Sequence, residues 1–383
     1  MNTPTNYRSS ETGFKTIAAI ATPLGEGGIG VIRISGDDAQ NVLHRIFSKK
    51  IHLEPSKIYH GYIIEPTTNE QIDEVLAFYQ QKPNSYTGED VVEISGHGSI
   101  ATLHKILDLA IKNGAELAQP GEFTKRAFLN GRIDLAQAEA VCDLIKAKTP
   151  EFHKIAFGQL KGKLSKEIYN IRGKLIDLIS MIEASIDFND DIGDIKKEEV
   201  KERLESIRKQ IINILSTAEH GILLRSGIKA VIVGKPNVGK SSLLNKLLEE
   251  ERALVSDKPG TTRDFIVDMI NILGIPLEII DTAGIRGSGD EIECMSMDKT
   301  LAQIREAGLV LFITDISQPL DSDDQRIVSE LNSRKFILIL NKSDIDKGSI
   351  AISEVEKIAG NNPYLAISAL RGDGIEELKQ LIY

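Results

Sequence analysis

Hydrophobic and polar positions follow three different patterns along the 383 residues of the chain. Between about residues 14 and 118, short apolar runs of strand type dominate and helical patterns separate them. The apolar runs lie at 29–34, 75–79 and 91–94, and the helical patterns lie near 38–47 and 99–113. This mixture predicts a small α+β domain at the N-terminus.

A helical pattern replaces the strand pattern between about residues 120 and 222. Apolar residues recur there at steps of three to five, from Phe152 to Ile182 and again from Leu204 to Leu215. This spacing predicts two long helices that pack together. The acidic stretch 187–194 lies between them and predicts a turn, because its spacing is not that of a calcium-binding EF-hand loop.

The last third of the chain carries apolar runs that each end at a polar motif, at 228–233, 277–280, 336–340 and 364–367. We therefore predict a multidomain protein. Its parts are an α+β domain over 1–119, an α-helical central domain over 120–225 and an inserted α/β domain over 226–383.

Composition narrows the class of protein. A hydrophobic content of 41% supports buried cores, and Cys142 and Cys294 are too far apart in sequence to indicate a disulfide framework. Cys142 lies in an apolar helical pattern, which predicts a core position. We expect a cytoplasmic protein without a membrane span, because the N-terminus lacks a signal pattern and no apolar run approaches about 18 residues.

The formal net charge of −10 argues against a general electrostatic attraction to nucleic acid. A local basic patch is still compatible with that total.

The segment from Gly234 to Ser241 follows an apolar run and opens a helical pattern. Its two glycines let several backbone amides face one anion, and the positive end of the following helix points to the same place. Lys240 is placed to reach the β and γ phosphates, and the Ser241 hydroxyl is a ligand for Mg²⁺. A plain glycine-rich turn is the alternative, but the strand before and the helix after favour a phosphate-binding loop.

Guanine selectivity is indicated downstream. Asn341, Lys342 and Asp344 follow an apolar run, and the Asp carboxylate can accept both the N1 and N2 protons that guanine has and adenine lacks. Ser368 and Ala369 resemble the segment whose backbone amide contacts the guanine oxygen. A polar strand-to-helix turn is the alternative for the first motif, and the order and spacing of the two motifs argue against it.

Two switch segments lie between these motifs. Thr262, in the segment 260–264, is predicted to bind Mg²⁺ and the γ-phosphate. Asp281 would hold the metal through water, and the Gly284 amide would contact the γ-phosphate. The segment 281–284 is also compatible with an ordinary turn at a strand end, but its position after the phosphate loop favours the switch.

The residue after Gly284 is Ile285, whose branched alkyl group cannot orient an attacking water. Catalysis must therefore use another group. The candidates are a carboxylate from the acidic tract 290–293 and a monovalent cation held by Asn237. A solvated loop is an equally good interpretation of the acidic tract.

Long runs outside the nucleotide motifs carry a more specific resemblance. They lie at 21–23, 27–36, 85–98, 120–132 and 134–140. With these runs the chain, from residue 14 to residue 383, resembles the tRNA modification GTPase family MnmE, also called TrmE. The resemblance implies a GTPase domain of the Ras-like, TrmE-Era-EngA type and an N-terminal domain similar to folate-binding domains.

The N-terminal domain of this family is implied to dimerise and to hold 5-formyltetrahydrofolate or a related folate. Matched by motif, Arg33, Glu89 and Arg132 would contact the folate. A structural ion pair is the alternative for Arg33 and Glu89. Arg132 stands where the family usually has lysine, so the charge is preserved but its geometry is not.

The resemblance also implies how GTP is hydrolysed. Glu293 would orient the water, and Asn237, Ser256, Lys258 and Thr261 would form a potassium site that is completed when two GTPase domains meet. Lys258 and Pro259 depart from the family pattern, and the Lys258 ammonium could compete with potassium. The implied GTP contacts are Asn237, Val238, Gly239, Lys240, Ser241, Ser242, Ser256, Asp257, Lys258, Pro259, Gly260, Thr261, Thr262, Asp281, Thr282, Ala283, Gly284, Asn341, Lys342, Asp344, Ser368, Ala369 and Leu370.

The implied function is tRNA modification together with a flavoprotein partner, MnmG, in a heterotetramer. The pair would add an aminomethyl or carboxymethylaminomethyl group to carbon 5 of the wobble uridine of certain tRNAs. Two alternatives remain: a GTPase switch in ribosome assembly, similar to the Era or Der families, and a non-catalytic dimerising scaffold. Binding of a folate by the N-terminal region would distinguish the tRNA-modification function from the ribosome-assembly switch.

The family usually continues beyond the position of Tyr383 with further helices and a Cys-x-Gly-Lys motif. We therefore expect residues 120–222 to expose an apolar face, and we expect this chain alone not to complete the modification.

Overall fold

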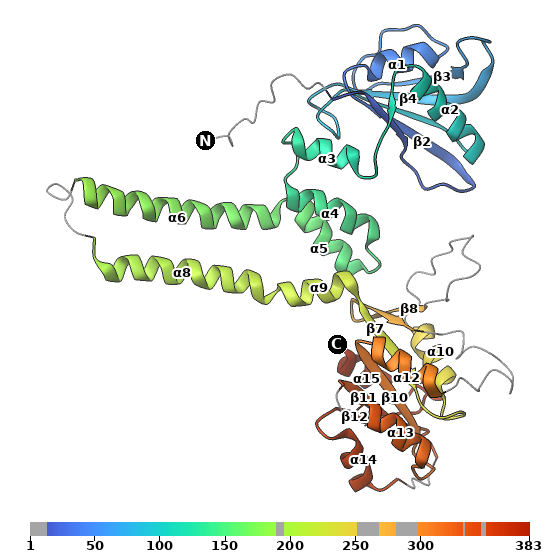
Figure 1. The fold of residues 1–383 in the computed structure, drawn as a ribbon, viewed down its shortest axis with the longest axis vertical. Helices are drawn as coiled ribbons and strands as arrows, with labels where there is room; N and C mark the ends of the chain where they lie inside the picture. The colour runs from blue at the N-terminus through green and yellow to red at the C-terminus, as the bar shows by residue number, and fades with distance from the viewer. Residues whose placement is uncertain (1–13, 189–194, 251–267, 281–296, 332–333, 346–349) are drawn as a thin grey trace. The chain divides into compact units, whose positions relative to one another are not determined.

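A computed structural model describes residues 14–188, 195–250, 268–280, 297–331, 334–345 and 350–383. The chain divides into two compact units, which we call the N-terminal unit, residues 1–141, and the C-terminal unit, residues 142–383. This division is coarser than the three predicted domains. Figure 1 shows the elements of both units.

The N-terminal unit contains a six-stranded sheet with the strand order β3-β4-β5-β2-β1-β6. Neighbouring strands are antiparallel except β6, which pairs parallel with β1. The strands are β1 (Ile17–Ile20), β2 (Gly27–Ser35), β3 (Ile58–Ile64), β4 (Gln71–Gln80), β5 (Val91–Gly98) and β6 (Glu116–Leu117). The helices are α1 (Ala39–Ile46), α2 (Ile100–Lys112) and α3 (Glu122–Leu129), and α4 (Leu135–Lys146) runs across the division between the units.

Helices α1 and α2 cover one face of this sheet and form the core with it. On β2, Ile32 and Ile34 are fully buried in that core, so Arg33 between them points to the opposite face. The first turn of α2 is capped by Ser99, whose Oγ accepts a hydrogen bond from the Thr102 N–H at 3.2 Å. The predicted strands and helices of this region are confirmed.

The helical region contains more breaks than predicted. Its helices after α4 are α5 (Pro150–Leu160), α6 (Lys163–Asp187), α8 (Lys197–Ser216) and α9 (Ala218–Ser226). The first predicted long helix is thus two helices, because Gly162 adopts a left-handed φ of 76° and ends the hydrogen-bond ladder. Helices α6 and α8 pack against each other as expected. Residues 189–194 of the predicted turn lie outside the described residues.

The prediction that Cys142 lies in the core is wrong, because its side chain is exposed. Helix α4 instead turns Ala140 and Asp143 inward, one helical turn apart. The Asp143 carboxylate is buried and pairs with Arg225 of α9 at 3.0 Å. An ion pair therefore takes the inward position that the apolar pattern predicted for the cysteine.

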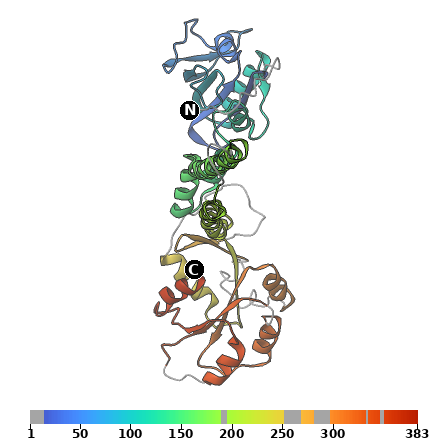
Figure 2. The ribbon, with the colours of Figure 1, turned by 90° about the vertical axis from the view of Figure 1, so that its left-hand side faces the viewer.

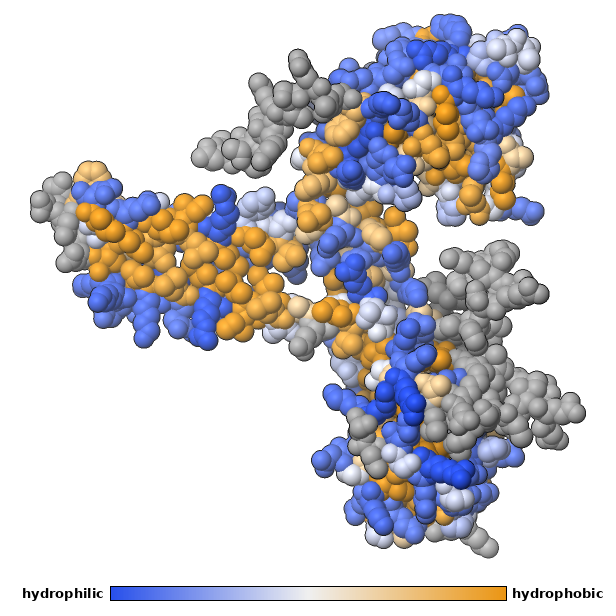
Figure 3. Space-filling view, viewed as in Figure 1, coloured by the Kyte–Doolittle hydropathy of each residue, from blue (hydrophilic) through white to orange (hydrophobic). Residues whose placement is uncertain are grey.

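Large apolar side chains are exposed along α6 and α8, which confirms the predicted apolar face within residues 120–222 (Figure 3). They include Ile168, Ile176, Ile179 and Ile186 on α6 and Leu204, Ile211, Ile212 and Leu215 on α8. Among the described residues, no helix combines the length and the apolar character that crossing a membrane requires.

The second sheet of the chain also has six strands, in the order β12-β11-β10-β7-β9-β8. All neighbours are parallel except β8, which runs antiparallel to β9. The strands are β7 (Ile228–Val233), β8 (Asp268–Ile272), β9 (Ile275–Ile279), β10 (Leu309–Asp315), β11 (Phe336–Asn341) and β12 (Tyr364–Ala366). The helices are α10 (Lys240–Glu250), α12 (Met297–Glu306), α13 (Ser322–Leu331), α14 (Ile352–Ala359) and α15 (Ile375–Ile382).

Two apolar cores lie on the two faces of this sheet, one with α10 and α15 and the other with α12, α13 and α14 (Figure 2). Burial on both faces explains the continuous apolar runs of β10 and β11. The strand order reverses at β7, since later strands lie on both sides of it. The loop after β7 therefore lies in the crevice where such sheets bind ligands.

Candidate functional site

The loop between β7 and α10 requires both of its glycines. A Cβ added to Gly234 would lie 2.2 Å from the carbonyl oxygen of Ile313, and one added to Gly239 would lie 2.2 Å from Nδ2 of Asn341. Gly239 also has a φ of 101°, which only glycine adopts without strain. The loop therefore packs directly on the ends of β10 and β11, and its backbone amides stay close to the crevice.

Lys240 is held over this loop by backbone groups. Its Nζ donates to the carbonyl oxygens of Gly234 at 3.0 Å and Lys235 at 2.7 Å. Both of these acceptors are backbone carbonyl groups of the loop, so the loop itself fixes the position of the ammonium. Asn237 in the same loop has a φ of 61°, a left-handed conformation that asparagine tolerates better than most residues.

Asn341 joins the phosphate loop to the segment after β12. Its Nδ2 donates to the carbonyl oxygen of Val238 at 2.7 Å, and its Oδ1 accepts the N–H of Ala369 at 2.9 Å. The side chain is buried, so both hydrogen bonds are shielded from water. One residue thus fixes the phosphate loop and the predicted guanine segment relative to each other.

Lys342 and Asp315 form the next contact of the site. Their Nζ and Oδ2 atoms lie 2.6 Å apart, and Asp315 is buried at the end of β10. Burial acts to raise the pKa of the Asp315 carboxyl, but hydrogen bonds from Lys342 and Ser317 outweigh it and the pKa lies below its usual value. The backbone of Lys342 lies in the left-handed region, with a φ of 67°.

The contacts of the Asp344 carboxyl favour its ionised form. A hydrogen bond from the Ser368 side chain holds its pKa below the usual value, and Arg371 lies 4.0 Å away and adds a smaller effect. An ionised carboxylate is an acceptor at both oxygens, which is the form that pairs with the N1 and N2 protons of guanine. The structure thus brings Asp344 and Ser368, one residue from each of the two predicted guanine motifs, into contact.

Other predicted nucleotide contacts lie outside the described residues. They are Ser256, Asp257, Lys258, Pro259, Gly260, Thr261, Thr262, Asp281, Thr282, Ala283, Gly284 and Glu293. Among the residues that are described, no group of three His, Cys, Asp or Glu side chains is arranged to hold a metal ion.

A second polar cluster lies in the N-terminal unit, on the sheet face opposite α1 and α2. Arg33 pairs with Glu93 of the neighbouring strand at 2.7 Å, and its guanidinium carbon lies 5.2 Å from the ring centre of Tyr86. The guanidinium of Arg132 lies 5.3 Å from the same ring. Arg33 and Arg132, two of the three predicted folate contacts, therefore meet at Tyr86. Arg33 already has a carboxylate partner in Glu93.

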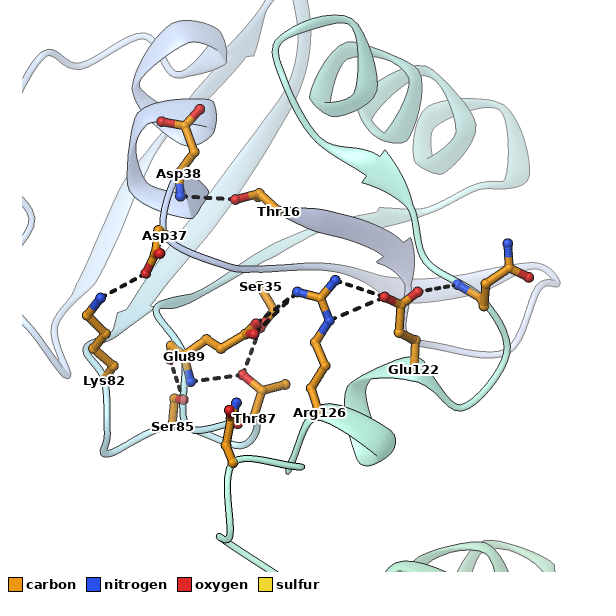
Figure 4. Close-up of polar contacts among 12 residues, drawn as sticks. Thr16, Ser35, Asp37, Asp38, Lys82, Ser85, Thr87, Glu89, Glu122 and Arg126 are labelled. Atoms are coloured by element: carbon orange, nitrogen blue, oxygen red, sulfur yellow. Dashed lines mark hydrogen bonds and ion pairs between the residues drawn. The ribbon is translucent and has the colours of Figure 1, made fainter. Parts of the chain in front are cut away.

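Glu89 is held from two sides (Figure 4). Its Oε2 accepts a hydrogen bond from Ser35 at 2.8 Å and pairs with Nη1 of Arg126 at 3.1 Å. Arg126 is almost fully buried and also pairs with Glu122 at 2.8 Å. Burial acts to raise the pKa of Glu122. The hydrogen bonds from the Gln119 backbone and the Arg126 side chain outweigh it, so the pKa lies below its usual value. One buried cation thus balances two carboxylates.

Comparison with known proteins places both parts of the chain in one family. Residues 16–132 match the family described as GTP-binding protein TrmE N-terminus, and residues 135–383 match the family described as MnmE helical domain. A protein of Acetivibrio thermocellus named tRNA modification GTPase MnmE is 48% identical to this chain, covering 96% of it and 81% of the relative. The chain belongs to the MnmE family.

Other MnmE proteins give the same picture. The relatives from Clostridioides difficile and Carboxydothermus hydrogenoformans are 48% and 46% identical, again over 96% of this chain and 81% of their own length. The solved structure of the G domain of the T. maritima FeoB iron transporter is 28% identical and covers 40% of this chain and 96% of its own. Its TM-score of 0.30 is too low to support an argument about the fold.

For this MnmE chain, motif reasoning missed the residues that hold the predicted contacts in place. Arg126, Ser35 and Asp315 each bind a predicted site residue, but none was assigned a role. The pairing of Glu122 with Arg126 has a signal in the sequence, because opposite charges four residues apart meet on one helix face. Ser35 and Asp315 are distant in sequence from the residues that they bind, Glu89 and Lys342, so these pairings carry no such signal.

Proposed function

We propose that the chain is a GTPase that binds and hydrolyses GTP and takes part in tRNA modification, as the names of its relatives state for those proteins. The observation that carries this proposal is the position of Asn341. It bonds both to the phosphate loop at Val238 and to the guanine segment at Ala369, so the two halves of a nucleotide site form one rigid unit.

A magnesium ion would be held by Ser241 and Thr262 and, through water, by Asp281. Bound Mg²⁺ neutralises charge on the phosphates. The position of Ser241 in the first turn of α10 fits this role, since the residue follows Lys240 directly. Asn237, with its backbone in the left-handed region beside Val238, is proposed as a ligand of K⁺ together with Ser256, Lys258 and Thr261.

We assign the orientation of the attacking water to Glu293, because Ile285 has no polar group for this step. The proposed role of the protein's own carboxylate is to accept a hydrogen bond from the water and to fix its direction toward the γ-phosphate. GTP turnover by this chain in potassium and in sodium buffer, with and without Glu293→Ala, tests the assignment. Loss of turnover with intact GTP binding supports it, and normal turnover of the variant contradicts it.

The N-terminal unit is proposed to bind 5-formyltetrahydrofolate or a related folate through Arg33, Glu89 and Arg132. Two guanidinium groups at one tyrosine ring suit an anionic ligand that carries an aromatic ring. Glu89 is an oriented acceptor, because Ser35 and Arg126 fix its carboxylate. Folates combine glutamate carboxylates with a pterin ring and match both features.

We further propose that the chain acts in the cytoplasm as a homodimer through its N-terminal domain. With the flavoprotein MnmG it would add an aminomethyl or carboxymethylaminomethyl group to carbon 5 of the wobble uridine of certain tRNAs. Support comes from membership of the MnmE family over both units. Calorimetric titration with GTP, ATP and 5-formyltetrahydrofolate tests the binding steps. A preference for ATP, or no folate binding together with stable ribosome association, would overturn them.

A further inference from the structure

We propose that Lys235 is a positioning residue of the phosphate loop: Asp321 and Asp324 hold its ammonium, and its own carbonyl oxygen holds Lys240. The inference rests on the proposed GTPase function. It concerns the loop position that directly follows Gly234 and precedes Gly239, the two required glycines.

The anchor of Lys235 is an ion pair with two carboxylates just before and within α13. Its Nζ lies 2.7 Å from Oδ2 of Asp324 and 3.0 Å from Oδ2 of Asp321. The side chain of Lys235 is 15% exposed, that of Asp324 only 1% and that of Asp321 54%. Lys235 is thus removed from solvent for most of its length and ends on a buried acceptor.

Asp324 depends on this lysine. Its Oδ2 also accepts the N–H of Asp321 at 3.2 Å, whereas its Oδ1 is buried and has no hydrogen-bond partner among the residues that the structure describes. Burial acts to lower the pKa of Lys235, but the bonds from Asp324 and Asp321 outweigh it and the pKa is raised. A buried carboxylate with one cationic partner holds that partner firmly, because separating them leaves an uncompensated charge.

The anchored residue is also a backbone acceptor. Lys240 donates to the carbonyl oxygens of Gly234 and Lys235, so the peptide that Lys235 supplies is part of the contact that places the proposed phosphate-binding ammonium. A loop peptide without a side-chain anchor must lose rotational freedom when the nucleotide binds, and this loss opposes binding. The clamp on Lys235 removes that freedom before the nucleotide arrives.

A purely electrostatic role makes the opposite prediction. A carboxylate near a triphosphate repels it, so Asp324→Asn should then strengthen GTP binding, and the effect should fade as salt is raised. If Asp324 acts by holding Lys235, the same substitution weakens GTP binding at both low and high salt. The sign of one measured change therefore separates the two explanations.

The experiment measures binding of a non-hydrolysable GTP analogue by calorimetry at about 0.05 and 0.5 M salt, with a urea midpoint for each variant. We expect Asp324→Asn and Lys235→Met each to weaken binding about tenfold, the scale of one charge-assisted hydrogen bond. Lys235→Arg, whose guanidinium reaches both carboxylates, should keep binding near that of the unchanged chain. Arg305→Met is the matched control, because it removes an exposed cation paired with Glu330 at 2.8 Å in the same domain.

The double variant Lys235→Met/Asp324→Asn separates positioning from stability. It removes the uncompensated buried charge, so the urea midpoint should recover relative to Lys235→Met while binding of the analogue stays weak. Recovery of both would make the pair purely structural and overturn the proposal. Equal or tighter binding by Asp324→Asn would also overturn it. If the unchanged chain does not bind the analogue, the proposed GTPase function fails and the role of Lys235 fails with it.

Discussion

Lys240 and Asn341 at one polar site of this molecule are held by a different kind of partner from Arg33 and Arg126 at the other. At the phosphate loop, Lys240 and Asn341 bind backbone carbonyl and amide groups. In the N-terminal unit, Arg33 of β2 and Arg126 of α3 bind carboxylates. The first arrangement ties side chains to the backbone of the loop, whereas the second pairs each cation with a carboxylate before any ligand arrives. Backbone partners fix the loop and its side chains relative to each other, and side-chain partners build a balanced network of charges.

Sheet topology explains the difference. In the parallel sheet, loops from several strand ends meet at one edge, so backbone groups are close to the side chains. In the antiparallel sheet, residues of neighbouring strands lie opposite each other, and the register places Arg33 directly across from Glu93. A charged side chain on such a sheet therefore contacts the side chain opposite it rather than a backbone group.

The largest effect is expected for Arg126→Met, which leaves two carboxylates without their shared buried cation. We expect the N-terminal unit to lose about 3 to 5 kcal/mol of unfolding free energy. GTP binding should be unchanged, because the C-terminal unit does not contain this network. Urea unfolding and calorimetric titration measure the two results.

The control for Arg126 is Arg45→Met, since Arg45 pairs with Asp38 at 3.0 Å in a solvent-exposed position. This change should cost at most about 1 kcal/mol. Equal losses for both variants would show that the buried network does not differ from a surface ion pair.

Asn341→Ala should have the next largest effect, on the opposite site. It removes both bonds between the phosphate loop and the guanine segment, so we expect GTP-analogue affinity to fall about a hundredfold. Asn362→Ala is a matched control, because Asn362 also makes two backbone hydrogen bonds, to Phe336 and Ala359, away from the loop. It should lower the urea midpoint without changing the affinity; a similar affinity loss in both variants would contradict the bridging role.

Substitutions of Arg33 and Glu93 test whether this ion pair is part of a balanced network only or also part of a ligand-binding site in the N-terminal unit. If Arg33 binds the folate, Arg33→Met weakens 5-formyltetrahydrofolate binding about tenfold. Glu93→Gln then strengthens it, because the guanidinium no longer has a competing carboxylate. Titration calorimetry gives both changes. No response to either substitution would leave Arg33 with a purely structural ion pair.

The smallest expected effect is the response to acid. The pKa values of Glu122 and Asp315 are lowered in the folded state, so the unfolded chain takes up protons first as pH falls. Their stabilising contribution is complete above the ordinary carboxyl pKa and is lost as pH drops through the lowered value. Each carboxyl changes the unfolding free energy by at most about 1.4 kcal/mol per pH unit.

Glu122→Gln and Asp315→Asn test this acid response in the two units separately. Each variant should flatten the dependence of its urea midpoint on pH between about 5 and 3. A variant whose midpoint still falls as steeply as that of the unchanged chain would assign the acid sensitivity to other groups.

Much of the fold follows from local patterns. Apolar alternation located β2 and β5, helical spacing located α1 and α2, and the glycines at 234 and 239 located the phosphate loop. These features are readable because period, turn chemistry and backbone conformation depend on residues close together in the chain. Asn341 and Asp344 were found in the same way, by their place after an apolar run.

Pairings between distant residues were not readable in this way. The ion pair of Glu89 with Arg126 and that of Lys235 with Asp324 each join residues on separate parts of the fold. The exposure of Cys142 likewise depends on how α4 packs. Which charge meets which depends on strand register and on how loops pack at the sheet edge, and both are properties of the whole fold. The sequence by itself determined which kinds of site this protein builds, and only the tertiary structure decided how each charged group is held.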